Sequence, residues 1–449
     1  MGRLFGTDGV RGVANSELTC ELALQIGRAT AMVLSEGKRK RLKVLVAADT
    51  RISSEMLLAA ISAGFCSVGA DVLVLGVLPT PAVAYLVKKY RYDAGVMISA
   101  SHNPCEYNGI KIFKSDGYKL PDELEERIEA IILDGIHSPD IKIGGDVGRI
   151  SFGEKAKSDY IGHLLSTVDT DFSGIKIALD CANGSSAFTA PELFTQLDAD
   201  FQILSSDPDG ININRNCGST HIERLQEFVK ENECDIGLAF DGDADRLIAV
   251  DENGNIVDGD KIVAICAAAL KERSNLSKNT AVVTVMSNLG FHNFCSSRGI
   301  DVVVTAVGDR YVLEAMLEGG YSVGGEQSGH IIFLDHATTG DGQLTAIQLL
   351  NILKKSGKSF SGLASEIEIY PQVTVNVQVS KIGKVRFAND EEIKKAVSSA
   401  EAELGSTGRV LVRVSGTEPL VRVMAEGKNE IQIRRLANEI ATVIKERLI

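Results

Sequence analysis

The sequence predicts an α/β protein with three similar α/β domains, whose sheets are mixed and mainly parallel, followed by a smaller C-terminal α+β domain. Strand-type runs alternate with helix-length segments for most of the chain, and the same order of runs occurs three times. From about residue 370 the pattern changes to strict alternation. The length of 449 residues fits several domains, because ordinary domains hold about 100–200 residues.

Each repeat contains strand-type runs separated by helix-length segments, then a polar loop and a returning strand. The runs and the loops that follow them cover 43–49, 70–76, 94–104 and 109–113 in the first repeat, 176–184, 200–205, 234–246 and 247–251 in the second, and 281–288, 300–310, 321–330 and 331–335 in the third.

Three distinctive loops occupy the same place in these repeats: SASHNP (99–104), DGDADR (241–246) and GEQSGH (325–330). Each follows the third strand of its repeat, and ligands bind beyond the carboxyl ends of parallel strands in open α/β sheets. We therefore expect the loops to converge on one central cleft. The alternative is that three polar loops share this position by chance.

The C-terminal segment reads as a small α+β domain with an antiparallel sheet. QVTVNVQVS (372–380) alternates with period two, and two further strand-type runs, RVLVRVS (409–415) and LVRVMAEG (420–427), follow a charged helical stretch. The predicted domains are 1–153, 154–256 and 257–368 for the three repeats and 369–449 for the C-terminal segment.

Composition excludes several classes of protein. A formal net charge of −13 argues against a general role on nucleic acid or on a membrane surface. The eight cysteines are scattered without a C-x-x-C spacing, which fits reduced cytosolic thiols. No run of about 18 apolar residues and no signal-peptide core is found, so we expect a cytoplasmic, soluble protein.

The segment DGDADR predicts a site for a divalent cation. Asp241, Asp243 and Asp245 are two residues apart, and carboxylate oxygens on a curled loop favour Mg²⁺ or another hard cation over zinc. An EF-hand is a rival, but Arg246 stands where that loop needs glycine, and the flanks read as strands. A solvated acidic turn remains the structural alternative.

Ser101 and His102 allow three interpretations: a hydrolase nucleophile, a phosphate acceptor or an ordinary turn serine. Neighbouring residues of an extended segment point to opposite faces, so His102 is poorly placed as a base for Ser101. The G-x-S-x-G elbow is also absent from this loop. Given a metal loop in the same cleft, phosphoryl transfer explains more, because Mg²⁺ can neutralise a phosphoryl group that a serine carries.

Two further loops could contact a phosphosugar. RVSGTEPLVRV (413–423) joins two strands and offers hydroxyls, backbone N–H groups and two arginines to a phosphate, although it could be a plain hairpin turn. GEQSGH places a carboxylate and a hydroxyl, suited to sugar hydroxyls, on a glycine-rich turn. Asp309 and Arg310 lie in the same repeat, and Arg11 comes from FGTDGVRG (5–12).

Taken together, these motifs resemble those of the α-D-phosphohexomutase superfamily, in the order expected of it and along the whole chain. SASHNP is similar to its phosphoserine loop, DGDADR to its metal loop, GEQSGH to its sugar loop and RVSGTEP to its phosphate loop. FGTDGVRG and Gln327 resemble the branch that acts on amino-sugar phosphates. Cys105 departs from the more usual aromatic residue, which affects loop packing more than chemistry.

The resemblance implies an enzyme that interconverts glucosamine 6-phosphate and glucosamine 1-phosphate, feeding UDP-N-acetylglucosamine and cell-wall synthesis. Ser101 would be phosphorylated, would give its phosphoryl group to the bound sugar phosphate, and would regain one after the bisphosphate turns around. The implied cofactors are one Mg²⁺ per chain and a hexose bisphosphate as activator.

The resemblance also implies residue roles. The metal ligands would be Ser101, Asp241, Asp243 and Asp245. The catalytic residues would be Ser101, Arg11, His102, Lys111 and His330, with no ranking of Arg11, Lys111 and His330 in charge stabilisation and proton transfer. The substrate-binding residues would be Asp309, Arg310, Glu326, Ser328, Arg413, Ser415, Gly416, Thr417 and Arg422.

Other functions stay open at this point. A mutase for glucose or mannose phosphates would differ only in its choice of sugar, and a non-catalytic phosphosugar-binding protein could use the same fold. A serine hydrolase is the weakest alternative. We expect a small phosphosugar as partner, with neither nucleic acid nor membrane, and a homodimer is compatible with the resemblance.

Overall fold

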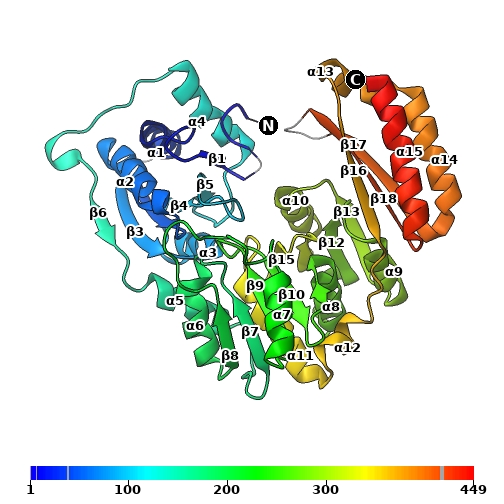
Figure 1. Ribbon diagram of the computed structural model, residues 1–449. Coiled ribbons are helices and arrows are strands. Elements are labelled where there is room, and N and C mark those ends of the chain that lie inside the picture. Colours follow the sequence, from blue (N-terminus) through cyan, green and yellow to red (C-terminus); the bar gives the residue numbers. More distant parts are fainter. Residues whose placement is uncertain (1, 7, 38–39, 415–418, 449) are drawn as a thin grey trace. The chain divides into compact units, whose positions relative to one another are not determined.

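The computed structural model describes residues 2–6, 8–37, 40–414 and 419–448 (Figure 1). The chain divides into two compact units, a larger one of Met1–Met286 with Ile300–Ser365 and a smaller one of Ser287–Gly299 with Glu366–Ile449. Among the described residues, no helix combines the length and the apolar character that crossing a membrane requires.

A six-stranded sheet with the order β1-β5-β4-β2-β3-β6 organises the N-terminal part of the larger unit. Strands β4, β2 and β3 are parallel, and β5 returns antiparallel to β4. The elements are β1 (Val10–Val13), α1 (Cys20–Ser35), β2 (Lys43–Ala48), α2 (Ile52–Ser67), β3 (Asp71–Val77), α3 (Thr80–Lys89), β4 (Ala94–Ile98), β5 (Tyr107–Lys114), α4 (Asp122–Asp134), η1 (Gly144–Asp146) and β6 (Ile150–Phe152).

Two further sheets complete the larger unit, with the orders β11-β10-β9-β7-β8 and β13-β12-β14-β15. The elements of the first are α5 (Ala156–Leu165), β7 (Lys176–Asp180), α6 (Ser186–Gln196), β8 (Asp200–Leu204), α7 (Glu223–Glu231), β9 (Ile236–Phe240), β10 (Leu247–Asp251) and β11 (Ile256–Val257). Those of the second are α8 (Gly259–Glu272), η2 (Ser277–Asn279), β12 (Thr280–Thr284), β13 (Asp301–Thr305), α10 (Asp309–Gly319), β14 (Val323–Gly325), β15 (Ile331–Phe333), α11 (Gly342–Ser356) and α12 (Phe360–Ala364).

The three sheets share one topology, which confirms the prediction of three similar α/β repeats. In each, the first strand lies between the second and the third in parallel, and the fourth strand pairs antiparallel with the third. The central strands β4, β9 and β12 are buried along their whole length, as expected for strands covered on both faces. The edge strands β1, β6 and β11 were not predicted.

The smaller unit contains an antiparallel sheet with the order β16-β18-β17, which confirms the predicted C-terminal α+β domain. Its core is formed by the apolar faces of the strands and of the long helices. The elements are α9 (Leu289–Ser297), β16 (Gln372–Gln378), α13 (Lys381–Arg386), η3 (Phe387–Asn389), α14 (Glu391–Leu404), η4 (Gly405–Thr407), β17 (Gly408–Val414), β18 (Leu420–Gly427) and α15 (Glu430–Leu448).

Helix α9 belongs to this smaller unit by its packing, although the sequence-based division assigns it to the third repeat. Asn288 caps the helix and exchanges hydrogen bonds of 2.9 Å with the backbone of Tyr370, and Glu426 accepts a hydrogen bond of 2.5 Å from the Leu289 N–H group. The four domain boundaries given above therefore stay predictions.

Candidate active site

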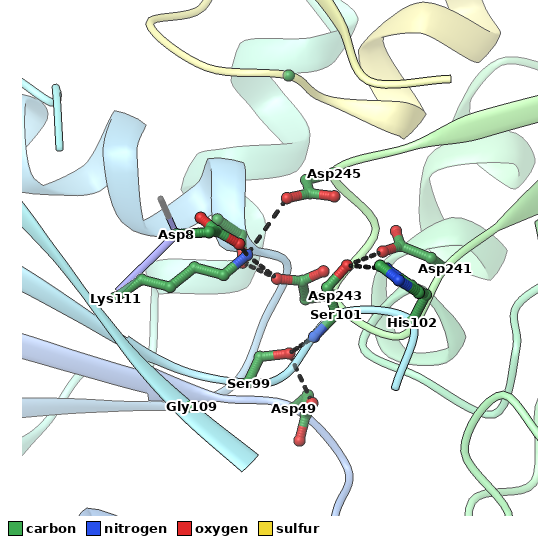
Figure 2. A network of polar contacts seen from close by, with 12 residues as sticks. Asp8, Asp49, Ser99, Ser101, His102, Gly109, Lys111, Asp241, Asp243 and Asp245 are labelled. Carbon is green, nitrogen blue, oxygen red and sulfur yellow. Dashed lines mark hydrogen bonds and ion pairs between the residues drawn. The ribbon is translucent and has the colours of Figure 1, made fainter. Parts of the chain in front are cut away.

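Ser101 lies in the turn between β4 and β5, where a backbone of unusual conformation presents its hydroxyl. Its φ angle is 52°, in the left-handed region that costs a residue with a side chain about 1–2 kcal/mol. The residue is 1% exposed, and its Oγ donates a hydrogen bond of 2.6 Å to Asp241 Oδ2 (Figure 2). The serine and the metal-loop candidate, 140 positions apart in the chain, are thus in direct contact.

His102 also lies beside the Ser101 hydroxyl, with Nδ1 3.2 Å from Oγ. The prediction that His102 points away from Ser101 is wrong, because β4 ends at Ile98 and Ser101 adopts a turn conformation rather than an extended one. Burial, followed by the charges of Arg246 and Arg11, lowers the pKa of His102 to about 4. The ring is therefore neutral at neutral pH and can accept or donate a hydrogen bond at the serine.

Asp241, Asp243 and Asp245 follow β9 and turn their carboxylates toward one point. One oxygen of each lies within 4.8 Å of the others, and all three residues are buried. Burial, with the charges of Asp245 and Asp243, raises the pKa of Asp241 well above its usual range. Within the described part of the chain, Oδ1 of Asp243 and of Asp245 accept no hydrogen bond.

These features fit a hard divalent cation. Buried oxygen atoms normally have a hydrogen-bond partner or a metal, and three clustered carboxylates repel one another without positive charge between them. An all-oxygen donor set favours a hard cation, the class to which Mg²⁺ belongs, over zinc. The Ser101 hydroxyl at the edge of the triad would complete the set.

Lys111 brings the nearest positive charge to the triad. Its ammonium is 1% exposed and lies 2.8 Å from Asp243 Oδ2, 3.3 Å from Asp245 Oδ2 and 3.0 Å from Asp8 Oδ2. Although burial opposes the charge, these carboxylates raise the pKa of Lys111 well above its usual range. Lys111 therefore stays charged next to the triad.

Asp8 joins Lys111 to two more cations from separate elements. It accepts hydrogen bonds from Arg11 and Lys119, and Lys119 also donates 2.6 Å to Asp309 Oδ2 on α10. Burial opposes the negative charge of Asp8, but Lys111, Lys119 and Arg11 together lower its pKa well below the usual range. The first and third repeats thus meet through alternating charges.

His330 lies between the metal-loop candidate and α10. Its Nδ1 is 3.7 Å from Asp245 Oδ2 and its Nε2 is 3.7 Å from Asp309 Oδ2. The Gly340 N–H group donates a hydrogen bond of 3.0 Å to Nε2, so a neutral ring carries its proton on Nδ1, toward Asp245. Burial opposes a charge on the ring, but the two carboxylates raise its pKa.

Glu326 and Ser328 lie on the turn between β14 and β15. Glu326 Oε1 accepts a hydrogen bond of 3.1 Å from the Gly308 N–H group, and burial raises the pKa of this carboxyl. Ser328 is exposed. This turn comes close to the metal loop, because Leu247 N–H donates to the Gly329 carbonyl and Arg246 forms a β-bridge with His330.

Arg310 does not join this cluster. Its guanidinium donates to Asp122 at the start of α4 and, at 3.1 Å, to Glu314 one helical turn further along α10. Its neighbour Asp309 lies within the cluster, through Lys119.

In the smaller unit, Arg413 and Arg422 are cross-strand partners on β17 and β18. Burial and then the charge of Arg422 lower the pKa of Arg413. Like charges directly opposite in a sheet destabilise it, and a bound anion would relieve that repulsion. Ser415, Gly416 and Thr417, which the sequence also predicts for this site, lie outside the described residues.

Sequence reasoning missed several residues of the cluster. Asp8 and Lys119 connect its cations and carboxylates, and Arg246 approaches Asp245 to 3.9 Å. Arg51 donates to the Ser101 carbonyl at 2.9 Å from the start of α2. Arg51 comes two residues after the predicted strand 43–49, the kind of position where polar residues meet at a sheet edge, and this signal could have found it.

Comparison with known proteins covers the whole chain. Family models for phosphoglucomutase/phosphomannomutase match in four consecutive parts: α/β/α domain I at 2–137, domain II at 158–254, domain III at 258–370 and the C-terminal domain at 375–443. The chain is 56% identical over 448 residues to phosphoglucosamine mutase of Acetivibrio thermocellus, covering 100% of both chains. Phosphoglucosamine mutase of Clostridium novyi is 54% identical over 450 residues, covering 100% of this chain and 99% of that protein.

Solved structures share the fold at lower identity. A phosphoglucomutase/phosphomannomutase family protein from Burkholderia thailandensis superimposes with a TM-score of 0.83 at 23% identity, covering 100% of this chain and 99% of the other. N-acetylphosphoglucosamine mutase of Aspergillus fumigatus, in complex with GlcNAc-6P and magnesium, gives a TM-score of 0.70 at 17% identity, covering 100% and 96%. With the family matches and the full-length relatives, these results establish that the chain belongs to the phosphoglucomutase/phosphomannomutase family.

Proposed function

We propose that this protein is a phosphoglucosamine mutase, which interconverts glucosamine 6-phosphate and glucosamine 1-phosphate. The observation that carries the proposal is the direct hydrogen bond between Ser101 Oγ and Asp241, at the edge of a buried triad suited to Mg²⁺. The choice of an amino sugar is supported by the full-length relatives at 54–56% identity, which bear this name.

Ser101 is the proposed carrier of the phosphoryl group. In the first half-reaction the bond between phosphorus and Ser101 Oγ breaks while a bond forms between phosphorus and the free hydroxyl oxygen of the sugar phosphate. The sugar hydroxyl loses its proton, and Ser101 ends the step as a hydroxyl. After the bisphosphate turns around, the reverse transfer from its other phosphate restores phosphoserine, so a hexose bisphosphate can prime the enzyme.

Asp241, Asp243, Asp245 and the Ser101 oxygen would hold Mg²⁺. The ion supplies positive charge that neutralises the phosphoryl group during transfer. Lys111, whose ammonium lies 3.0 Å from Asp8 and 2.8 Å from Asp243, is proposed to stabilise negative charge at the same place.

Arg11, His102 and His330 are the remaining proposed catalytic residues. Arg11 is held by Asp8, and His102 contacts the Ser101 hydroxyl directly. His330, with its proton directed toward Asp245 when neutral, is a candidate for moving a proton at the sugar hydroxyl.

Substrate binding is proposed to use two regions. Glu326 and Ser328 offer a carboxylate and a hydroxyl to the sugar in both of its orientations. Arg413 and Arg422, as a cross-strand pair of cations, would bind the phosphate that does not react. Ser415, Gly416 and Thr417 belong to the same proposed site.

The test is the ratio of kcat/KM for glucosamine 6-phosphate to that for glucose 6-phosphate, with Mg²⁺ and a catalytic amount of glucose 1,6-bisphosphate. A large preference for the amino sugar is expected. A preference for glucose 6-phosphate would support the mutase reaction but contradict the proposed amino-sugar substrate. Binding without turnover of either sugar would overturn the proposal of an enzyme.

A further inference from the structure

The guanidinium of Arg51, at the start of α2, donates hydrogen bonds to the carboxylate of Asp49 and to backbone carbonyls of the segment 101–107. Nε donates 2.8 Å to Asp49, Nη2 donates 2.9 Å to the carbonyls of Ser101 and of Asn103, and Nη1 donates to the carbonyls of Pro104 and, at 3.0 Å, of Tyr107. Arginine has five N–H donors, and the carbonyls that accept from Arg51 lie in the turn that presents Ser101 and in Tyr107, the first residue of β5.

Asp49 faces this arginine from the end of β2, and both side chains are 0% exposed. Its carboxylate also accepts hydrogen bonds from the Arg51 N–H group at 3.1 Å and from the hydroxyls of Ser54 at 2.8 Å and Ser99 at 2.7 Å. Ser99 in turn accepts a hydrogen bond of 2.9 Å from the Ser101 N–H group, and Figure 2 shows Ser99 between Asp49 and Ser101.

Both peptide groups of Ser101 are therefore tied to one buried ion pair. The N–H side is held through Ser99 and Asp49, and the carbonyl side is held by Arg51, with a second donor at 2.9 Å from Asn214 Nδ2. A residue with a side chain keeps a left-handed conformation only when its surroundings impose it, and these bonds supply that constraint at Ser101.

We propose that Arg51, together with Asp49 and Ser99, is a positioning residue that keeps the Ser101 hydroxyl directed at the metal loop. We call these three residues the clamp. This inference rests on the proposed function, since the clamp holds the serine that is proposed to carry the phosphoryl group. The pair carries no net charge and none of its hydrogen bonds leads to a group proposed to bind the sugar. Its loss is therefore expected to lower kcat and leave KM unchanged.

Two variants probe the two halves of the clamp. Ser99→Ala keeps both charges of the ion pair and removes the acceptor of the Ser101 N–H group, together with one hydroxyl that donates to Asp49. Arg51→Lys keeps a cation beside Asp49, but one ammonium cannot reach carbonyls on several sides as a planar guanidinium does. A displacement of about 1 Å at a reacting group can cost about 100-fold in rate, and we expect a loss in kcat approaching that size in both.

Matched controls come from the same repeat. Ser62 is another buried serine, on α2, and its hydroxyl has no hydrogen-bond partner among the described residues, so Ser62→Ala should behave as wild type. Arg41 also pairs with an aspartate, Asp71, and donates to the carbonyls of Gly145 and Val147, far in the sequence from Ser101. Arg41→Lys should keep the kcat of the wild type.

The experiment measures kcat, KM, the melting temperature and, by intact mass, the rate at which glucose 1,6-bisphosphate phosphorylates Ser101. Lower kcat and slower phosphorylation in Ser99→Ala, with KM unchanged, supports the clamp. Wild-type values in the folded Ser99→Ala protein overturn it, whether or not Arg51→Lys folds. A wild type that is phosphorylated but acts only on glucose phosphates would overturn the proposed substrate, and the phosphorylation rates would still decide this inference.

Discussion

The loop 99–104 packs against the loop 241–246 so tightly that Gly242 has no room for a methyl group. An ideal Cβ there would lie 2.6 Å from the Ser101 carbonyl oxygen, 2.8 Å from Ile213 Cδ1 and 2.9 Å from Asn214 Nδ2. The φ angle of Gly242 is not positive, so alanine can adopt the backbone conformation itself. Gly242→Ala therefore acts through steric contact alone.

The size of the effect follows from that contact. A carbon atom and a carbonyl oxygen normally stay about 3.3 Å apart, so one loop must move by roughly 0.7 Å. Reacting groups need to be held within about 0.5 Å, and a 1 Å error can cost about 100-fold in rate. We expect Gly242→Ala to lower kcat by about 10- to 100-fold and to destabilise the fold by about 1–3 kcal/mol.

The assay compares kcat for glucosamine 6-phosphate with the melting temperature of the same preparation. Gly162→Ala is the matched control, because Gly162 lies in helix α5 with no neighbour within 4 Å of an ideal Cβ. This control should keep the wild-type kcat and gain about 0.5–1 kcal/mol of stability. Wild-type turnover in the folded Gly242→Ala protein would refute the claim that Ser101 must be held against the metal loop.

Three other substitutions test separate parts of the account. Thr80→Val removes the hydroxyl that donates to Asp243 Oδ2, so the affinity for Mg²⁺, measured by calorimetry, should fall by about 10-fold or more. Glu129→Gln weakens the acceptor of three N–H groups at the N-terminus and should cost about 1.5–3 kcal/mol at neutral pH. The backbone hydrogen bonds outweigh burial and lower the pKa of Glu129, so its contribution is complete above about pH 4.5 and is lost as the pH falls through the folded-state pKa. Urea unfolding at several pH values measures that difference. Arg422→Leu should raise KM by about 10- to 100-fold in steady-state assays, because a charged hydrogen bond to phosphate contributes about 1.5–3 kcal/mol.

Each of these predictions has its own control. Thr80→Ser restores the hydroxyl and should restore metal affinity, and equal affinity in Thr80→Val would contradict the assigned hydrogen bond. Glu123→Gln changes an exposed residue of the same helix, and a stability loss in Glu129→Gln that persists at pH 3 would contradict the linkage to its ionisation. Arg434→Ala removes an exposed arginine of α15, and the phosphate-binding proposal fails if it raises KM as much as Arg422→Leu does.

Much of the fold was predictable because the succession of strands and helices along the chain follows from local patterns. Repeated apolar runs with a polar loop after the third run predicted the parallel strands and the returning strand of each sheet, and the three sheets share that order. The packing of α9 was not predictable, because it depends on a contact between Asn288 and Tyr370, which are 82 positions apart in the chain. The periodicity of a short segment gives no information about contacts between residues so far apart in the chain.

The candidate active site also has a part that was predictable from the sequence and a part that was not. The spacing of Asp241, Asp243 and Asp245 predicts a cluster of carboxylates from the sequence alone, and the structure brings their oxygens together. The charge chain through Asp8 and Lys119 depends on three elements distant in sequence, so no local motif contains it.

The left-handed conformation of Ser101 could not be predicted from the sequence pattern either. Serine in a polar loop reads as a turn residue whatever its φ angle, and the partners that impose the angle are Arg51 and Asn214, far away in the chain. The erroneous placement of His102 followed from this, because an extended backbone was assumed where the chain turns.

The central claim, that Ser101 carries the phosphoryl group, is tested most directly by single-turnover transfer. The protein is labelled with radioactive phosphate from glucose 1,6-bisphosphate, the labelled peptide is mapped, and excess glucosamine 6-phosphate is added. We expect label on Ser101 that passes into a glucosamine bisphosphate at the rate of turnover. Sustained turnover without label on Ser101, or label that stays on the protein while product forms, would contradict it.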